Sequence, residues 1–229
     1  FFGNVVLLPL WLQQWMGYTA TWAGLAMAPV GLLAIVLSPL VGRNVGRVDP
    51  RRLATVAFLG FALVLWMRSR FTVQAPFETI LWPTVLQGAA MAFFFIPLQA
   101  IIFSGLTPEQ LPAASGLSNF VRITAGAMGT SLFTTVWEDR AVLHHAHLAE
   151  RVNDGNAAAQ LALAQLGASG QTPEQAWSTI HRLLDQQAYT AAVTDLFALS
   201  SLMFLALIGL VWLTRPKRAA APVDAGGAH

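Results

Sequence analysis

Arg122 is the residue that most strongly suggests chemistry, because it is the one charged residue in the apolar stretch of residues 112–137. An arginine at the centre of a membrane-spanning helix costs roughly 2.5–3.5 kcal/mol on insertion scales, so a cavity, a carboxylate or backbone carbonyls usually compensate it. Small and polar residues surround Arg122 at helical spacing and therefore share much of one face; they are Ser115, Ser118, Asn119, Gly126, Gly129, Thr130 and Thr134. The pattern predicts either a cavity-facing cation that binds substrate or couples to protons, or a structural lock between two helices.

A second candidate is Asp195, which lies just inside the apolar stretch of residues 189–213 and is the acidic residue nearest to the membrane centre. A carboxylate at that depth can take up and release a proton during transport. The alternative is structural, because an acidic side chain next to Thr194 would stabilise the N-terminus of a helix beginning there. Glu78, at the start of residues 78–107, has the same two interpretations, and the structural one is favoured for both residues.

Aromatic side chains and methionine gather within residues 78–107, at Trp82, Met91, Phe93, Phe94, Phe95 and Phe103. Such side chains can line a hydrophobic drug cavity, although packing against lipid or other helices is the commoner use.

A metal site is poorly supported. His144 and His147 can share a helix face with Glu150 nearby, but no second ligand-bearing segment is evident, and zinc sites usually have three or four ligands. The chain has no cysteine, which excludes thiolate ligands and a cysteine nucleophile. It also lacks a phosphate-binding loop, a Ser/His/Asp triad and paired carboxylates. We therefore expect no catalytic residues, metal or cofactor.

The composition places the chain in the membrane class. Of its 229 residues 55% are hydrophobic and 10% are charged, whereas a soluble domain carries about 25% charged residues. The formal net charge is +2, but the basic residues form no single stripe and no aromatic–basic module, which argues against nucleic-acid binding.

The apolar stretches predict an all-α, polytopic bundle of transmembrane helices. A span needs roughly 20 apolar residues. Five spans are predicted within residues 1–137, at 1–16, 20–41, 53–67, 78–107 and 112–137, and a last one at 189–213. The first begins inside an apolar run without an initiator Met, so we expect it to be truncated. Residues 138–188 have heptad-like pieces and predict a helical loop, and the Ala/Pro/Gly-rich tail of residues 214–229 is predicted to be disordered.

The distribution of basic residues predicts the orientation in the membrane. Cytoplasmic loops are enriched in Lys and Arg. With six spans, residues 42–52 and the tail fall on the same side and together hold seven of the thirteen basic residues. That side is therefore predicted to be cytoplasmic, with the C-terminus inside and the acidic segment 138–187 outside.

Several segments, by their order and spacing, resemble the EmrB/QacA branch of the major facilitator superfamily over nearly the whole chain. They are LLPLWLQ at residues 7–13, GYTA at 17–20, AGLAMAP at 23–29, FFIPL at 94–98, ASGLSNFVR at 114–122 and GAMGTS at 126–131. The resemblance implies a fourteen-helix drug:proton antiporter, of which this chain supplies about the last six helices. It also implies a bacterial inner membrane, a periplasmic adaptor (a membrane fusion protein) and an outer-membrane channel as partners, and a periplasmic location for residues 138–187.

The loop of residues 42–52 resembles a degenerate copy of the superfamily's cytoplasmic loop motif. The matching positions are Gly42, Arg43, Arg47, Asp49, Arg51 and Arg52. The Asp-Arg pair expected after Gly42 is missing, so the motif's role as a conformational latch does not transfer directly.

The sequence thus predicts proton-driven export of hydrophobic and amphipathic drugs. The candidates for the substrate and proton pathway are Arg122, Asn119, Ser118, Gly126, Thr130 and Asp195. The resemblance places the antiporter signature and the main proton carboxylates in the other half of the transporter, so this chain alone should not transport. The alternative is a non-transporting membrane scaffold, or a component that binds a partner through residues 138–187. A membrane enzyme is disfavoured because no catalytic constellation is present.

Overall fold

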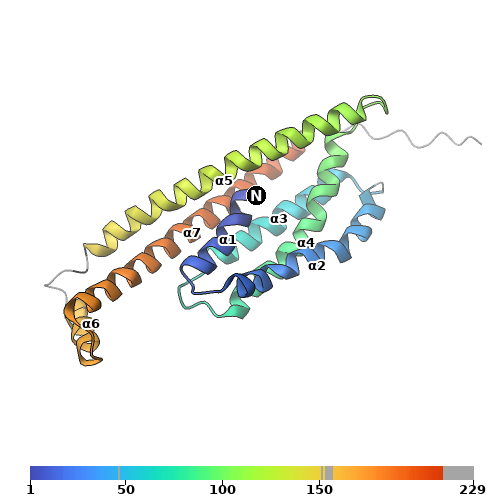
Figure 1. Cartoon of the computed structure of the whole chain (residues 1–229). Helices are drawn as coiled ribbons and strands as arrows, with labels where there is room; N and C mark the ends of the chain where they lie inside the picture. The colour runs from blue at the N-terminus through green and yellow to red at the C-terminus, as the bar shows by residue number, and fades with distance from the viewer. Residues whose placement is uncertain (46, 151, 153–156, 214–229) are drawn as a thin grey trace, which may run out of the picture.

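A computed structural model describes the chain except for residues 46, 151, 153–156 and 214–229. The predicted tail therefore lies outside the described residues. The described part contains seven helices and no strand (Figure 1). These are α1 (Phe2–Gln14), α2 (Ala20–Val45), α3 (Pro50–Arg68), α4 (Phe77–Ile102), α5 (Leu111–Ala149), α6 (Ala157–Ala168) and α7 (Pro173–Leu213). The all-α bundle predicted from the sequence is confirmed.

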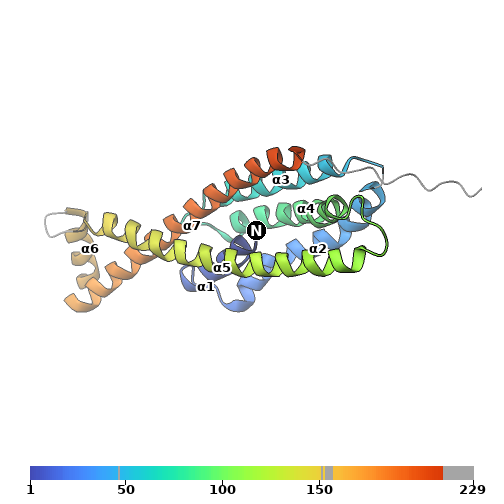
Figure 2. The same ribbon diagram turned by 90° about the horizontal axis from the view of Figure 1, so that it is seen from above.

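The helices pack as a chain of neighbours around the short α1. Helix α2 lies on α4, α4 on α3, α3 on α7 and α7 on α5, while α1 contacts α5, α2 and α7 (Figures 1 and 2). Phenylalanine rings pack against one another in the core. The ring centroid of Phe61 lies 5.4 Å from that of Phe1, 5.2 Å from that of Phe94 and 5.1 Å from that of Phe204. Each aromatic pair at such a distance contributes about 0.5–1.5 kcal/mol of stability beyond that gained from the surface area it buries.

Glycine allows the closest approach between two helices. A Cβ added to Gly88 of α4 would lie 2.8 Å from the carbonyl oxygen of Val30 and 2.9 Å from that of Pro29, both in α2. Small residues at helix interfaces let backbones come this close. Gly88 therefore sets the spacing of the α2–α4 pair.

Four of the described helices are long and apolar enough to cross a membrane, namely α2, α3, α4 and α7. They coincide with four of the six predicted spans. Helix α1 has 13 residues, fewer than a span needs. Helix α5 is long, but the polar residues around Arg122 lower its hydropathy. The spans predicted at residues 1–16 and 112–137 therefore stay predictions.

Helices α5 and α7 continue through the predicted boundaries at residues 138 and 188. They have 39 and 41 residues, about 58 and 62 Å at 1.5 Å per residue, whereas the hydrocarbon core of a bilayer is about 30 Å thick. The heptad-like pieces predicted for the loop thus extend the membrane helices without a break, because neither glycine nor proline interrupts residues 138–149 or 174–190. With α6 they form an extension that projects from one end of the bundle (Figure 1).

The predicted loop of residues 42–52 is shorter than expected. Gly42 and Arg43 belong to the last turns of α2, and Arg51 and Arg52 to the first turn of α3. Asp49 is the N-cap of α3, where its carboxylate accepts a hydrogen bond of 3.0 Å from the backbone N–H of Arg51. An aspartate followed by proline is a common helix start, so this part of the motif has a structural role.

Candidate functional site

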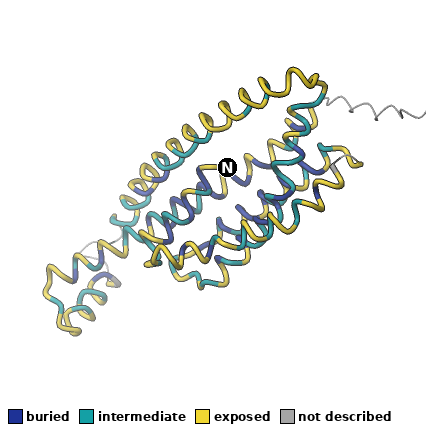
Figure 3. The backbone as a smooth tube through the Cα atoms, turned by 45° about the vertical axis from the view of Figure 1, so that its right-hand side comes forward, coloured by how far each residue is buried: buried dark blue, intermediate teal, exposed yellow. Residues whose placement is uncertain are grey.

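A cavity of about 1100 Å³ lies between α5, the end of α4 and the first residues of the chain. Phenylalanine rings form its apolar wall, including Phe2, Phe94, Phe95 and Phe103. The opposite wall is the polar face of α5. Figure 3 shows that α5 is exposed along most of its length, and only Trp137 and Ala141 are buried on it.

Arg122 faces this cavity. Its Nη2 donates a hydrogen bond of 2.6 Å to Oδ1 of Asn119, one turn earlier on α5. Ser118 and Gly126 also line the cavity, whereas Thr130 and Asp195 do not. No acidic residue is among the described residues of the lining. The cavity therefore presents one fixed positive charge and an amide beside a wall of aromatic rings.

Gly126 has a packing role in the same wall. A Cβ at this position would lie 2.8 Å from Cδ2 of Phe2, so glycine lets α1 approach α5. Of the aromatic candidates from the sequence, Phe94, Phe95 and Phe103 line the cavity, while Trp82, Met91 and Phe93 do not.

Sequence reasoning missed Arg68. The sequence places it at the end of the third span, where the side chain is expected to extend to water, but Arg68 is only 1% exposed. Its Nη2 donates to Oε1 of Gln87 at 2.6 Å and to Oγ1 of Thr84 at 3.3 Å, and its guanidinium lies 6.0 Å from the ring centroid of Phe197. Thr84 and Gln87 are three residues apart in an apolar helix, which is the one feature of the sequence that could have indicated a buried polar partner.

Asp195 lies in the interior of α7, 22 residues after Pro173, so the predicted position at a helix N-terminus is wrong. The reason is that α7 begins in the extension rather than at the start of the apolar stretch. Its Oδ2 lies 3.2 Å from Nη1 of Arg140 and 2.9 Å from Nε2 of His144, both on α5. Asp195 is thus one side of an ion-pair cluster and not part of the cavity.

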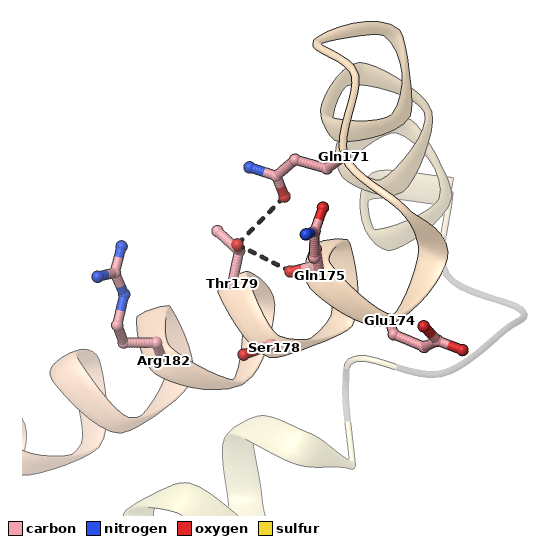
Figure 4. A pocket seen from close by; sticks show the side chains of 6 residues that line it. All are labelled: Gln171, Glu174, Gln175, Ser178, Thr179 and Arg182. Carbon is pink, nitrogen blue, oxygen red and sulfur yellow. Dashed lines mark hydrogen bonds between the residues drawn. The ribbon is translucent and has the colours of Figure 1, made fainter.

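A second, polar pocket of about 530 Å³ lies at the corner between α6 and α7. Thr179 connects its walls: its hydroxyl is the donor toward two acceptors, Oε1 of Gln171 at 3.2 Å and the carbonyl oxygen of Gln175 at 2.9 Å (Figure 4). Glu174 and Arg182 lie at its edges (Figure 4). These hydrogen bonds shape the turn into α7. The pocket is separate from the cavity, because no residue lines both.

The described residues contain no group of three or more His, Asp or Glu side chains arranged to hold a metal ion. His144, one of the residues considered for a metal, pairs with Asp195 instead.

Comparison with known proteins identifies the fold family. Residues 1–132 match the sequence profile of the Major Facilitator Superfamily. The chain belongs to this superfamily. It is 45% identical over its whole length to the multidrug export protein EmrB of Escherichia coli K12, of which it covers 45%. It is 38% identical to the fatty acid resistance protein FarB of Neisseria gonorrhoeae, over 99% of the chain and 44% of that relative. The EmrB protein of Haemophilus influenzae is also 38% identical, over 94% of the chain. No solved structure matches the chain.

These relatives confirm the predicted resemblance. The chain spans less than half the length of each of them. Superfamily membership and the four apolar helices together make it part of a multi-pass membrane protein, in a family whose members are transporters and generally not enzymes.

Proposed function

We propose that the transporter containing this chain exports hydrophobic and amphipathic drugs across the bacterial inner membrane, driven by protons. The observation that carries the proposal is the cavity of about 1100 Å³ with Arg122 and Asn119 on one wall and phenylalanine rings on the other. Ligand pockets of roughly 300–1000 Å³, mostly apolar with a few placed polar groups, suit drug-sized molecules. The relatives named for multidrug export support the same activity.

The lining favours substrates that combine an apolar body with an acidic or hydrogen-bond-accepting group. Arg122 offers the donors, and the described lining contains no carboxylate that would compete for them. Aromatic rings accept apolar bodies of many shapes. The relative named for fatty acid resistance is consistent with amphipathic acids among the substrates.

The proposed orientation lets the drug enter from the cytoplasm. The cavity lies near the connection between α4 and α5, which the predicted topology places on the cytoplasmic side, together with the C-terminus. Superfamily transporters bind substrate between two halves and move one half against the other, so the missing half would close the cavity. Arg122, Asn119, Ser118, Gly126 and Thr130 are our candidates for the drug path, and Asp195 for the proton path.

The extension formed by α6 and the adjoining ends of α5 and α7 is the proposed contact for a periplasmic adaptor, which would pass the drug to an outer-membrane channel. It projects beyond the bundle, where a partner on the outer side can reach it. The alternative function is a membrane scaffold that does not transport, and such a scaffold would use the same extension to bind its partner.

The test is drug efflux by the full-length protein in cells that lack other pumps, comparing Arg122→Ala with the unmodified protein. A hydrogen bond to a charged group contributes about 1.5–3 kcal/mol, so Arg122→Ala should raise the concentration of an acidic amphipathic drug needed for half-maximal efflux about ten- to hundred-fold. Arg70→Ala is the matched control, because Arg70 is exposed and stacks on Trp66, away from the cavity.

Efflux that is unaffected by Arg122→Ala at equal expression would remove Arg122 from the drug path. Absence of efflux by the unmodified protein across a broad panel of drugs would instead favour the scaffold.

A further inference from the structure

The ion pairs around Asp195 connect a long cavity-lining helix to its neighbour. A single carboxylate oxygen of Asp195 on α7 meets both Arg140 and His144 of α5, at 3.2 and 2.9 Å. The side chains of these three residues are 42%, 51% and 32% exposed, respectively. The described residues therefore do not enclose the cluster.

A group of aromatic rings lies near the cluster along α5 and α7. The ring of Tyr189 on α7 stacks on Trp15 at 4.1 Å and meets Trp137 of α5 edge-on at 5.3 Å. Asp195 follows Tyr189 by six residues, about 9 Å along α7, toward the apolar part of the helix. Arg140 and His144 follow Trp137 on α5, toward the extension. Along α7, Asp195 thus lies on the bundle side of Tyr189, and along α5, His144 lies on the extension side of Trp137.

We propose that His144 and Asp195 form a proton-binding site at the outer end of the bundle, and that its occupancy sets the position of α5. The proposal rests on the proposed function and assigns part of its proton coupling. The proton comes from water on the outer side and makes the imidazole of His144 a cation, whose Nε2–H donates to Oδ2 of Asp195. When the proton returns to water, Asp195 keeps Arg140 as its charged partner.

Helix α5 carries this change to the cavity. It runs without interruption from Arg122 to His144, 22 residues or about 33 Å. Its extensive packing is on α7 and α1. On α7 it is held by the Asp195 cluster and by the hydrogen bond of 3.0 Å from Nε1 of Trp137 to the carbonyl oxygen of Tyr189. Loosening one of these contacts lets the polar wall of the cavity move.

The other charged groups near the cluster make contacts of their own. A second pair, His145 with Asp185 at 3.5 Å, lies further along the extension, and the ring of His145 stacks on His181 at 6.4 Å. Helix α1 has no charged side chain, and Arg68 of α3 meets α7 at Phe197. Histidine loses its charge as the pH rises from 5 to 8. The contact is therefore strong at low pH and weakens as the pH rises.

The experiment measures the distance between α5 and α7 in the full-length protein in lipid nanodiscs. Spin labels are attached to cysteines introduced at Val142 and Leu183, two exposed positions of the extension, in a background without other cysteines. With His144 and Asp195 unchanged, the distance between the two labels should increase as the pH is raised from 5 to 8. His144→Gln should give the longer distance at every pH, and His144→Arg, which is always charged, the shorter one.

Three further variants make the result specific. Asp195→Asn keeps the volume and should also abolish the pH-dependent shift, which provides a second test if His144→Gln does not assemble. His147→Gln, on the same helix, and His145→Gln, at the second pair, should keep the shift. The proposal is overturned if the distance does not change with pH, or if His144→Gln and Asp195→Asn keep the shift. Because the measurement needs no drug, a protein that shows the shift but exports nothing would contradict only the proposed function.

Discussion

Arg122 and Arg68 show what residue type can and cannot predict. The polar face around Arg122 predicted a cavity-facing or helix-locking cation, and the side chain faces the cavity beside Asn119. Arg68 was expected to reach water from the end of a span, yet it is buried against α4 and α7. The difference arises because the surroundings of Arg68 depend on which face of α4 packs there, and a single sequence does not specify that packing.

Gln87 is predicted to stabilise the buried charge of Arg68. Its Oε1 accepts the shorter of the two hydrogen bonds from the guanidinium, at 2.6 Å. Gln87→Leu would leave a buried cation with fewer acceptors and should lower the free energy of unfolding by about 1.5–3 kcal/mol. Denaturant unfolding of the purified protein in micelles measures this loss. Gln74→Leu, at an exposed position of the loop before α4, should have no effect, and equal stability of the two variants would contradict the role of Gln87.

The positions of the membrane helices were predictable, and their full lengths were not. Uninterrupted apolar runs predicted α2, α3, α4 and α7, because such runs are long enough to span a bilayer. The predicted boundaries at 138 and 188 marked changes of polarity, whereas a helix ends at caps, glycine or proline. The polar segments keep the helical period, so α5 and α7 continue, and Asp195 falls in a helix interior instead of at its start.

The α2–α4 contact gives a test of helix packing. A Cβ at Gly88 meets backbone oxygens of α2, which cannot move aside as a flexible side chain can. Gly88→Ala should therefore cost about 1–3 kcal/mol of overpacking. Over most of that range the cost outweighs the roughly 1 kcal/mol by which a helix favours alanine. The same unfolding measurement applies. Gly209→Ala, with open space around the added Cβ, should be neutral or slightly stabilising, and a Gly88→Ala variant as stable as Gly209→Ala would show that the two helices are not in close contact.

At the scale of the whole molecule, the chain matches one part of longer relatives. Apolar side chains are exposed along α2 and α5, among them Leu32, Ile35, Leu117 and Phe120. The relatives are more than twice as long as the stretch they share with this chain. Lipid and the remaining helices of the full-length protein are the expected cover for these surfaces. Under the proposed function, the other half of the transporter completes a binding site with the polar wall of α5, so we expect that the isolated chain does not transport.

The central claim is that a proton gradient drives drug movement through a site that includes Arg122. Reconstituted full-length protein tests it most directly: drug uptake into proteoliposomes is recorded after a pH gradient, acidic inside, is imposed. The account predicts uptake that follows the gradient, collapses when a protonophore is added, and weakens at least about ten-fold in affinity with Arg122→Ala. Uptake of equal rate with and without the gradient, or no drug uptake at all, would contradict it.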